Sequence, residues 1–185
     1  DGDGRAEHSS VFVSGLQRPH GLVLHDGHLY IGSPSTIWRV AYSPGQTRAR
    51  SKPEPVTVQG ALGPGGGHWT RNLVFSGDGA KFFVTVGSYA NVGEEAEVRA
   101  SVQQFDAAGR GQRTFASGLR NPVGIAHYPG TDDLYVVVNE RDGLGDGLVP
   151  DFFTRVVAGG FYGWPYAYAG SHPDPVARWE SRCLL

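Results

Sequence analysis

The chain has 185 residues, a formal net charge of −2 at pH 7 and a sequence pI of about 6.4. A protein that binds nucleic acid or an anionic membrane usually carries an excess of positive charge, and this near-neutral chain does not. No nucleic-acid partner is therefore expected. Aromatic residues make up 11% of the chain, which excludes a disordered protein. No apolar run reaches the roughly 18 residues of a membrane span.

Glycine and cysteine usage narrows the fold class. The 28 glycines and 12 prolines, together with many valines, tyrosines and phenylalanines, are typical of short strands joined by tight turns. The single cysteine, Cys183, excludes an intrachain disulfide framework and a cysteine-based zinc site. The Asp-Gly-Asp-Gly opening at 1–4 lacks the later ligands of an EF-hand loop, and a solvated turn is expected there.

The expected elements, taken in chain order, fall into three similar units. The first unit contains an entry segment and two strands, at 14–22, 29–31 and 37–42. The second contains a strand, a Gly/Asp turn and two further strands, at 71–75, 77–79, 82–86 and 98–105. The third contains an entry segment and a strand, at 117–125 and 134–138. No segment follows a helical period for 12 residues or more, so helices are expected to be minor.

These units form an internal repeat of about 52 residues. Gly21, Asn72 and Gly124 occupy equivalent positions, 51 and 52 residues apart (72 − 21 and 124 − 72). Four short strands in each unit of roughly 40–50 residues are typical of a β-propeller blade. The alternative is a β-sandwich with an accidental likeness between segments, which a repeat in register three times disfavours.

Three blades do not close a ring. Known propellers have about 4–8 blades, and an open stack leaves two exposed edges. We therefore expect an all-β chain that is a fragment of a propeller, or one that covers its edges by pairing with a second copy as a homodimer.

Four segments carry a family resemblance. They read GGHWTRN at 66–72, GLRNPVG at 118–124, NERD at 139–142 leading to VPD at 149–151, and GGFYGWP at 159–165. In this order and spacing they resemble the soluble quinoprotein glucose and sorbosone dehydrogenases. The likeness extends from the N-terminus to about Asp174. It leaves a partial propeller at 1–174 and an unmatched tail at 175–185, which indicates truncation or an altered reading frame.

The resemblance implies a six-bladed propeller that holds pyrroloquinoline quinone (PQQ) and Ca²⁺ at one end of its central channel. It implies oxidation of the C1 hydroxyl of an aldose or related sugar to a lactone or acid, with hydride transfer to PQQ. It further implies that electrons then leave to an external acceptor and that the full protein is periplasmic or secreted. Because further quinone contacts come from later blades in that family, this chain alone is expected to bind PQQ weakly and to turn over slowly.

His68 is the candidate catalytic base. It follows the glycine-rich loop 63–67, and an imidazole titrates near neutral pH, as the oxidation of an alcohol requires. The alternative is a loop histidine that only hydrogen-bonds a backbone carbonyl. The resemblance implies an aspartate near Ser88 to orient the ring, but 87–89 holds no carboxylate. Ser88 or another group is therefore expected to take that role.

The resemblance implies two further binding residues, Arg120 and Asn121, and Arg71 is a third candidate because it lies three residues after His68. Arg120 and Asn121 match the pair that contacts quinone and substrate, and a guanidinium can grip the carboxylates of PQQ with paired donors. A blade-entry turn is the structural alternative, since Arg18-Pro19 lies in the equivalent place of the first unit. Arg71 is expected either to face the substrate or to cap the sheet.

The segment 139–142 matches the stretch whose backbone carbonyls bind calcium. Calcium takes six to eight oxygen ligands. By position the carbonyls are those of Arg141 and Asp142, with Glu140 beside the cofactor. Asp146 and Asp151 offer further carboxylates, and a solvated acidic loop explains them equally well.

Other features have structural readings. The aromatic segment 160–165 is expected to pack between blades, and five histidines match no role: His20, His25, His28, His127 and His172. Two other functions fit the same scaffold: a calcium-dependent lactonase and a binding module without catalysis.

Overall fold

The computed structural model describes residues 3–177, and this part of the chain is all β with no helix. The predicted turn at 1–4 therefore lies partly outside the described residues, as do Cys183 and most of the predicted tail at 175–185. No helix among the described residues is long and apolar enough to cross a membrane.

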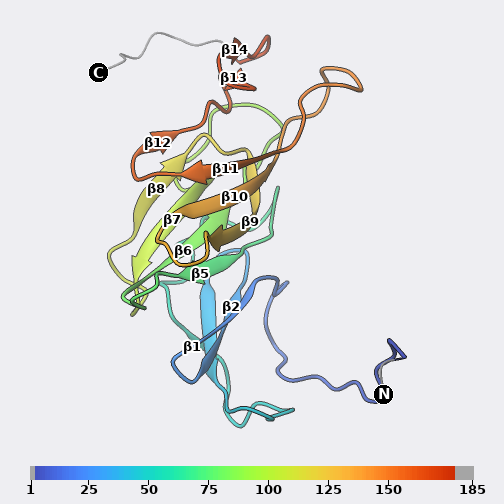
Figure 1. Ribbon diagram of the computed structural model, residues 1–185, viewed down its shortest axis with the longest axis vertical. Helices are drawn as coiled ribbons and strands as arrows, with labels where there is room; N and C mark the ends of the chain where they lie inside the picture. The colour runs from blue at the N-terminus through green and yellow to red at the C-terminus, as the bar shows by residue number, and fades with distance from the viewer. Residues whose placement is uncertain (1–2, 178–185) are drawn as a thin grey trace.

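Three antiparallel sheets follow one another along the chain (Figure 1). The first sheet contains β1 (Leu22–His25), β2 (His28–Gly32), β3 (Ile37–Ala41) and β4 (Glu54–Pro55). The second contains β5 (Leu73–Phe75), β6 (Lys81–Val86), β7 (Ser101–Asp106) and β8 (Arg113–Ser117), with β12 (Gly160–Phe161) added parallel to β8. The third contains β9 (Asn121–His127), β10 (Leu134–Asn139) and β11 (Phe152–Val156). A separate small hairpin joins β13 (Ala167–Tyr168) to β14 (His172–Pro173).

The predicted repeat is confirmed as a structural repeat. The Gly21 N–H donates to the Arg71 carbonyl at 2.9 Å, and the Asn72 side-chain amide donates to the Val123 carbonyl. Each unit is thus joined to the next at equivalent positions. A Cβ at Gly21 would lie 2.6 Å from Asn72 Oδ1, so only glycine allows this close approach.

Two hydrophobic clusters hold the three sheets together. Phe82 and Phe83 are neighbours on β6 and point to opposite faces of the second sheet, because side chains alternate along a strand. Phe82 is fully buried against the first sheet, with its ring 5.1 Å from that of Phe105. Phe83 packs against the third sheet beside Val136. The second sheet therefore contributes one face to each cluster.

One aromatic position recurs in all three sheets. In each unit, the residue two positions after Gly21, Asn72 or Gly124 is paired with an aromatic residue on the next strand. The pairs are Val23 with Tyr30, Val74 with Phe83 and Ala126 with Tyr135. Tyr30 is buried against the second sheet and Phe83 against the third. Tyr135 stacks on Phe153, which is 67% exposed, so the outward face of the third sheet is apolar and open.

The predicted strands at 29–31, 71–75, 82–86 and 134–138 fall on β2, β5, β6 and β10. The strand expected at 98–105 begins later, at Ser101. Residues 98–99 instead belong to an irregular segment that carries the buried side chain of Arg99.

Candidate active site around His68

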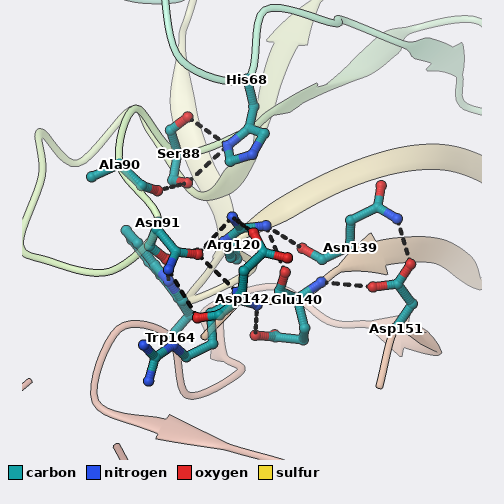
Figure 2. A network of polar contacts seen from close by, with 11 residues as sticks. His68, Ser88, Ala90, Asn91, Arg120, Asn139, Glu140, Asp142, Asp151 and Trp164 are labelled. Carbon is teal, nitrogen blue, oxygen red and sulfur yellow. Dashed lines mark hydrogen bonds and ion pairs between the residues drawn. The ribbon is translucent and has the colours of Figure 1, made fainter. Parts of the chain in front are cut away.

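The predicted site residues meet where several strands begin or end. His68 lies in the loop before β5, and Ser88 follows β6. Arg120 and Asn121 stand at the start of β9, next to the end of β10 in the antiparallel register, where Asn121 pairs with Asn139. Figure 2 shows His68, Ser88 and Arg120 at one end of these strands together with the segment 139–142.

Ser88 holds the His68 ring from one side. His68 Nδ1 lies 2.9 Å from the Ser88 carbonyl oxygen and 3.0 Å from Ser88 Oγ. The Ser88 hydroxyl donates its own proton to the Ala90 carbonyl at 2.6 Å, so both Ser88 oxygens are acceptors toward the ring. His68 therefore carries its proton on Nδ1 and leaves the Nε2 lone pair for a base. The sequence expectation that Ser88 replaces the missing carboxylate agrees with this geometry.

The electrostatic surroundings keep His68 neutral. Burial, and next the positive charge of Arg120, lower the pKa of His68 below its usual value. Its hydrogen bond to Ser88 opposes that shift without reversing it. A half-buried imidazole with a lowered pKa is already unprotonated at pH 7, which is the state that a general base requires.

Arg120 is buried, and the protein satisfies its guanidinium. Nε donates to the Asn91 carbonyl at 3.1 Å, and Nη1 donates to the carbonyls of Asn139 and Glu140 at 3.4 and 2.6 Å. Nη2 donates to Asn91 Oδ1 at 2.8 Å and to Asp142 Oδ2 at 3.2 Å. All five N–H groups therefore have acceptors. A direct contact between Arg120 and a cofactor stays a prediction. It would require Arg120 to give up a hydrogen bond, such as the one to the exposed Asp142 carboxylate.

Asn91 is the hub of this network, and the sequence did not reveal it (Figure 2). Its carbonyl accepts from Arg120 Nε and from Trp164 Nε1, each at 3.1 Å. Its side-chain amide pairs in both directions with the backbone of Asp142, at 2.9 and 3.0 Å. Asn91 thus joins the loop after β6 to the predicted calcium-binding loop after β10.

Asn121 presents an unsatisfied acceptor. Its Oδ1 is buried, and among the described residues it has no hydrogen-bond partner. It lies beside Gly87, where an added Cβ would clash with Asn121 Oδ1 and would stand 2.5 Å from His68 Cβ. Glycine at 87 therefore leaves room for both side chains. A buried orphan acceptor normally has an unseen hydrogen-bond donor as its partner.

Arg71 lies inside the protein and has no exposed surface. It donates to the carbonyls of His68 and Thr70, both at 2.8 Å, and to that of Pro34 at 3.0 Å. Burial lowers the pKa of Arg71 to about 9, which leaves it charged at pH 7. Its position favours the sheet-capping alternative, and contact with a substrate stays a prediction.

Glu140 lies beneath Arg120 at the end of β10 and is 6% exposed. Its backbone N–H donates to Asp151 Oδ1 at 2.9 Å, and Asp151 also accepts a hydrogen bond from the Asn139 amide. Asp151, although exposed, therefore holds the start of the 139–142 segment through two hydrogen bonds. Burial raises the pKa of the Glu140 carboxyl above its ordinary value.

This raised pKa predicts a pH-dependent stability. The folded protein keeps the Glu140 proton at a pH where the unfolded chain, with a pKa of about 4.3, has already lost it. The free energy of unfolding therefore falls as pH rises from there through the folded pKa. We expect Glu140→Gln, which cannot ionise, to gain stability relative to wild type over this window. Urea unfolding between pH 4 and 7 measures the difference, and a pH-independent difference contradicts the assignment.

The carbonyls predicted to bind calcium lie in a tethered loop. The Asp142 carbonyl accepts from Asn91, while its carboxylate is 87% exposed. The Arg141 side chain turns inward to a buried ion pair with Asp174 at 3.0 Å. Residues 3–177 contain no cluster of three or more His, Cys, Asp or Glu side chains able to hold a metal. Calcium here would depend on carbonyls, as the sequence reading implies.

The PQQ and calcium implied by the sequence fit this donor set in part. The lone pair of His68 Nε2 is free for a ligand, the buried Asn121 Oδ1 lacks a hydrogen-bond donor, and the Arg120 charge suits a polyanionic quinone. Arg120 offers no unused N–H in this arrangement. A polar pocket of about 330 Å³ lies in the loop 141–150. Another pocket, of about 550 Å³, borders Glu140 and the aromatic side chains of Phe152, Phe161 and Tyr162, and does not include His68.

Comparisons with known proteins agree with the resemblance. A family model described as TrAA12-like matches residues 2–149. An "Uncharacterized protein" of Borreliella burgdorferi is 26% identical over 161 residues, which cover 83% of this chain and 42% of that protein. The chain thus spans less than half the length of this curated relative.

Solved structures share the fold. An AA12-family carbohydrate-active enzyme of Trichoderma reesei has a TM-score of 0.69 at 21% identity, over 84% of this chain and 46% of that one. The PQQ domain of pyranose dehydrogenase from Coprinopsis cinerea gives 0.64 at 22% identity, over 82% and 41%. A PQQ-bound aldose sugar dehydrogenase from Streptomyces coelicolor gives 0.52 at 18% identity, over 92% and 70%. Because the family model covers most of the sequence, this chain belongs to the TrAA12-like family, whose structural relatives include PQQ-dependent sugar dehydrogenases.

Proposed function

We propose that this chain forms part of a quinoprotein that oxidises the C1 hydroxyl of an aldose or a related sugar to a lactone or acid. The observation that carries the proposal is the fixed His68 ring. Its Nδ1–H is held by Ser88, which leaves the Nε2 lone pair free, and the positive charge of Arg120 acts on the ring. The kinship with the TrAA12-like family supplies the reaction class.

In this proposal each residue has a defined task. His68 Nε2 takes the proton of the sugar hydroxyl, and Ser88 keeps the ring in the tautomer that allows it. Burial, and next the charge of Arg120, lower the pKa of His68 and so keep the base neutral beforehand. PQQ, when bound, would supply the hydride acceptor. The carbonyls of Arg141 and Asp142 would hold calcium, and Asn121 would accept a hydrogen bond from the sugar or the quinone.

We also propose that the three sheets are blades of a six-bladed propeller. The equivalent positions of Tyr30, Phe83 and Tyr135 support it, because each unit offers the same aromatic position to the next sheet. The coverage of only 46% of the Trichoderma structure supports it as well. The open face of the third sheet would then be covered by further sheets of a longer protein or by a second copy in a homodimer. Periplasmic or secreted localisation and an external electron acceptor complete the proposal.

A PQQ titration tests the function. Purified protein is titrated with PQQ, with and without calcium, while the visible spectrum of the quinone is followed. Calcium-dependent spectral change, and reduction of the quinone after an aldose is added, are the expected results. Magnesium in place of calcium is the control. Calcium-dependent hydrolysis of a lactone without any PQQ binding would favour the lactonase alternative instead.

This chain alone is expected to give only a small spectral change on titration with PQQ. In the quinoprotein sugar dehydrogenases that it resembles, later blades carry further contacts to the quinone. The same titration on a protein extended to six blades separates incompleteness from a wrong assignment. Absence of binding there contradicts the proposed function.

A further inference from the structure

Two irregular segments enclose His68. The glycine-rich segment 64–67 precedes it, and the segment 88–90 supplies its hydrogen-bond acceptors. Neither segment belongs to a strand. A Cβ at Gly67 would clash with Tyr89 Cα and stand 2.5 Å from the Tyr89 carbonyl oxygen, so the two segments are in close contact. The two segments are joined directly where the His68 N–H donates to the Ser88 carbonyl at 3.0 Å, and the side chains of Glu95 and Arg99 add a second link between them.

Glu95 holds the second segment. Its carboxylate accepts the Tyr89 N–H at 2.6 Å and the Ala90 N–H at 2.6 Å. The Ser88 hydroxyl donates to the Ala90 carbonyl within the same turn. Hydrogen bonds to an ionised carboxylate are stronger than neutral ones, so Glu95 fixes the backbone from which Ser88 reaches His68.

Arg99 holds the first segment and joins it to Glu95. Its Nη2 donates to the Gly66 carbonyl at 2.9 Å, and its guanidinium lies 6.0 Å over the Tyr89 ring. Arg99 Nε is 3.7 Å from Glu95 Oε2, and the two side chains are only 4% and 10% exposed. A buried carboxylate and a buried guanidinium thus link the loop before His68 to the segment opposite it.

We propose that Glu95 and Arg99 are a positioning pair that keeps His68 in its Nδ1–H tautomer with Nε2 free. Residues 87–89 contain no carboxylate that could contact the ring. The Glu95 carboxylate instead binds the backbone N–H groups of Tyr89 and Ala90, and so acts on the ring through the backbone of 88–90. The inference rests on the proposed function only for the role of His68 as a base. The tautomer itself is a property of this chain without cofactor or sugar.

The test is the tautomer of His68, read from long-range ¹H–¹⁵N spectra of the neutral imidazole, with the signals assigned by comparison with His68→Gln. Wild type is expected to show a single Nδ1–H tautomer. Glu95→Ala and Arg99→Ala are expected to show a mixture of the two tautomers. Glu97→Ala, a change at an exposed glutamate on the same segment, is the matched control and is expected to match wild type.

Conservative variants keep the test decisive if the alanine variants do not fold. Glu95→Gln retains one acceptor oxygen and Arg99→Lys retains the charge, so both are expected to lie between wild type and the alanine variants. A single Nδ1–H tautomer in every folded variant at 95 and 99 overturns the proposal, and so does a mixture in wild type. None of these readouts requires PQQ or sugar, so failure of the positioning pair and failure of the proposed function are distinguishable.

Discussion

Replacing His68 with glutamine is expected to slow reduction of bound PQQ by sugar about 10²- to 10⁴-fold, the usual contribution of a general base. Glutamine can keep a hydrogen bond to Ser88 but cannot accept a proton at neutral pH. The binding of PQQ itself is expected to change little, because the His68 ring is not among the predicted cofactor-binding residues. Single-turnover reduction, followed by the quinone spectrum in the presence of calcium, measures the rate without an external electron acceptor.

The control for this experiment is His172→Gln, at an exposed histidine outside the site. It is expected to leave the rate unchanged. In wild type the rate should fall only when pH drops below about 6.5, the ordinary pKa of histidine, because burial and Arg120 lower the pKa of His68. A His68→Gln protein that reduces PQQ at the wild-type rate removes His68 from the mechanism.

Asp174→Ala is expected to lower the free energy of unfolding by about 3–5 kcal/mol, the cost of leaving a buried charge without its partner. The Asp174 and Arg141 side chains are 2% and 6% exposed, and Arg141 Nε has no hydrogen-bond partner among the described residues. Asp174 also accepts the N–H groups of Val176 and Ala177. Its loss therefore frees the Arg141 side chain and the C-terminal segment together. Urea unfolding at pH 7 measures the change.

Two comparisons isolate the ion pair. Asp132→Ala, at an exposed carboxylate, is expected to change stability by no more than about 0.5 kcal/mol. The double variant Arg141→Met with Asp174→Leu removes both charges and is expected to be more stable than Asp174→Ala alone. An Asp174→Ala protein within about 1 kcal/mol of wild type would mean that solvent reaches Arg141 after the change.

The sequence predicted the sheets well because their signals are local. Alternating or continuous apolar runs identify β2, β6 and β10, and Gly/Asp turns separate them. The register of the repeat at Gly21, Asn72 and Gly124 was also visible, since each unit must meet the next in the same way. Composition, short apolar strands and the internal repeat thus predicted the all-β class and its division into three similar units.

The support of the site was not visible in the sequence. Asn91, Glu95 and Arg99 lie in an irregular segment with no apolar period, and their partners are backbone groups as far away as Asp142. A carboxylate that binds two amide N–H groups carries no sequence signature beyond its own presence. Arg120 was expected to contact the quinone or to lie in a blade-entry turn, and the five acceptors that surround its guanidinium come from two segments, Asn91 and residues 139–142, an arrangement that only tertiary structure defines.

The recurring aromatic position at Tyr30, Phe83 and Tyr135 has a consequence for how such a protein grows. Each added sheet would cover the apolar outer face of the sheet before it and would present an apolar outer face of its own. Adding sheets therefore does not by itself remove the exposed apolar face. The stack therefore always ends in one sheet whose outer face is uncovered. Only contact with its own first sheet, or with that of another molecule, covers this face, and until then the exposed ring of Phe153 and the Tyr135 ring stacked on it remain a site for unintended association.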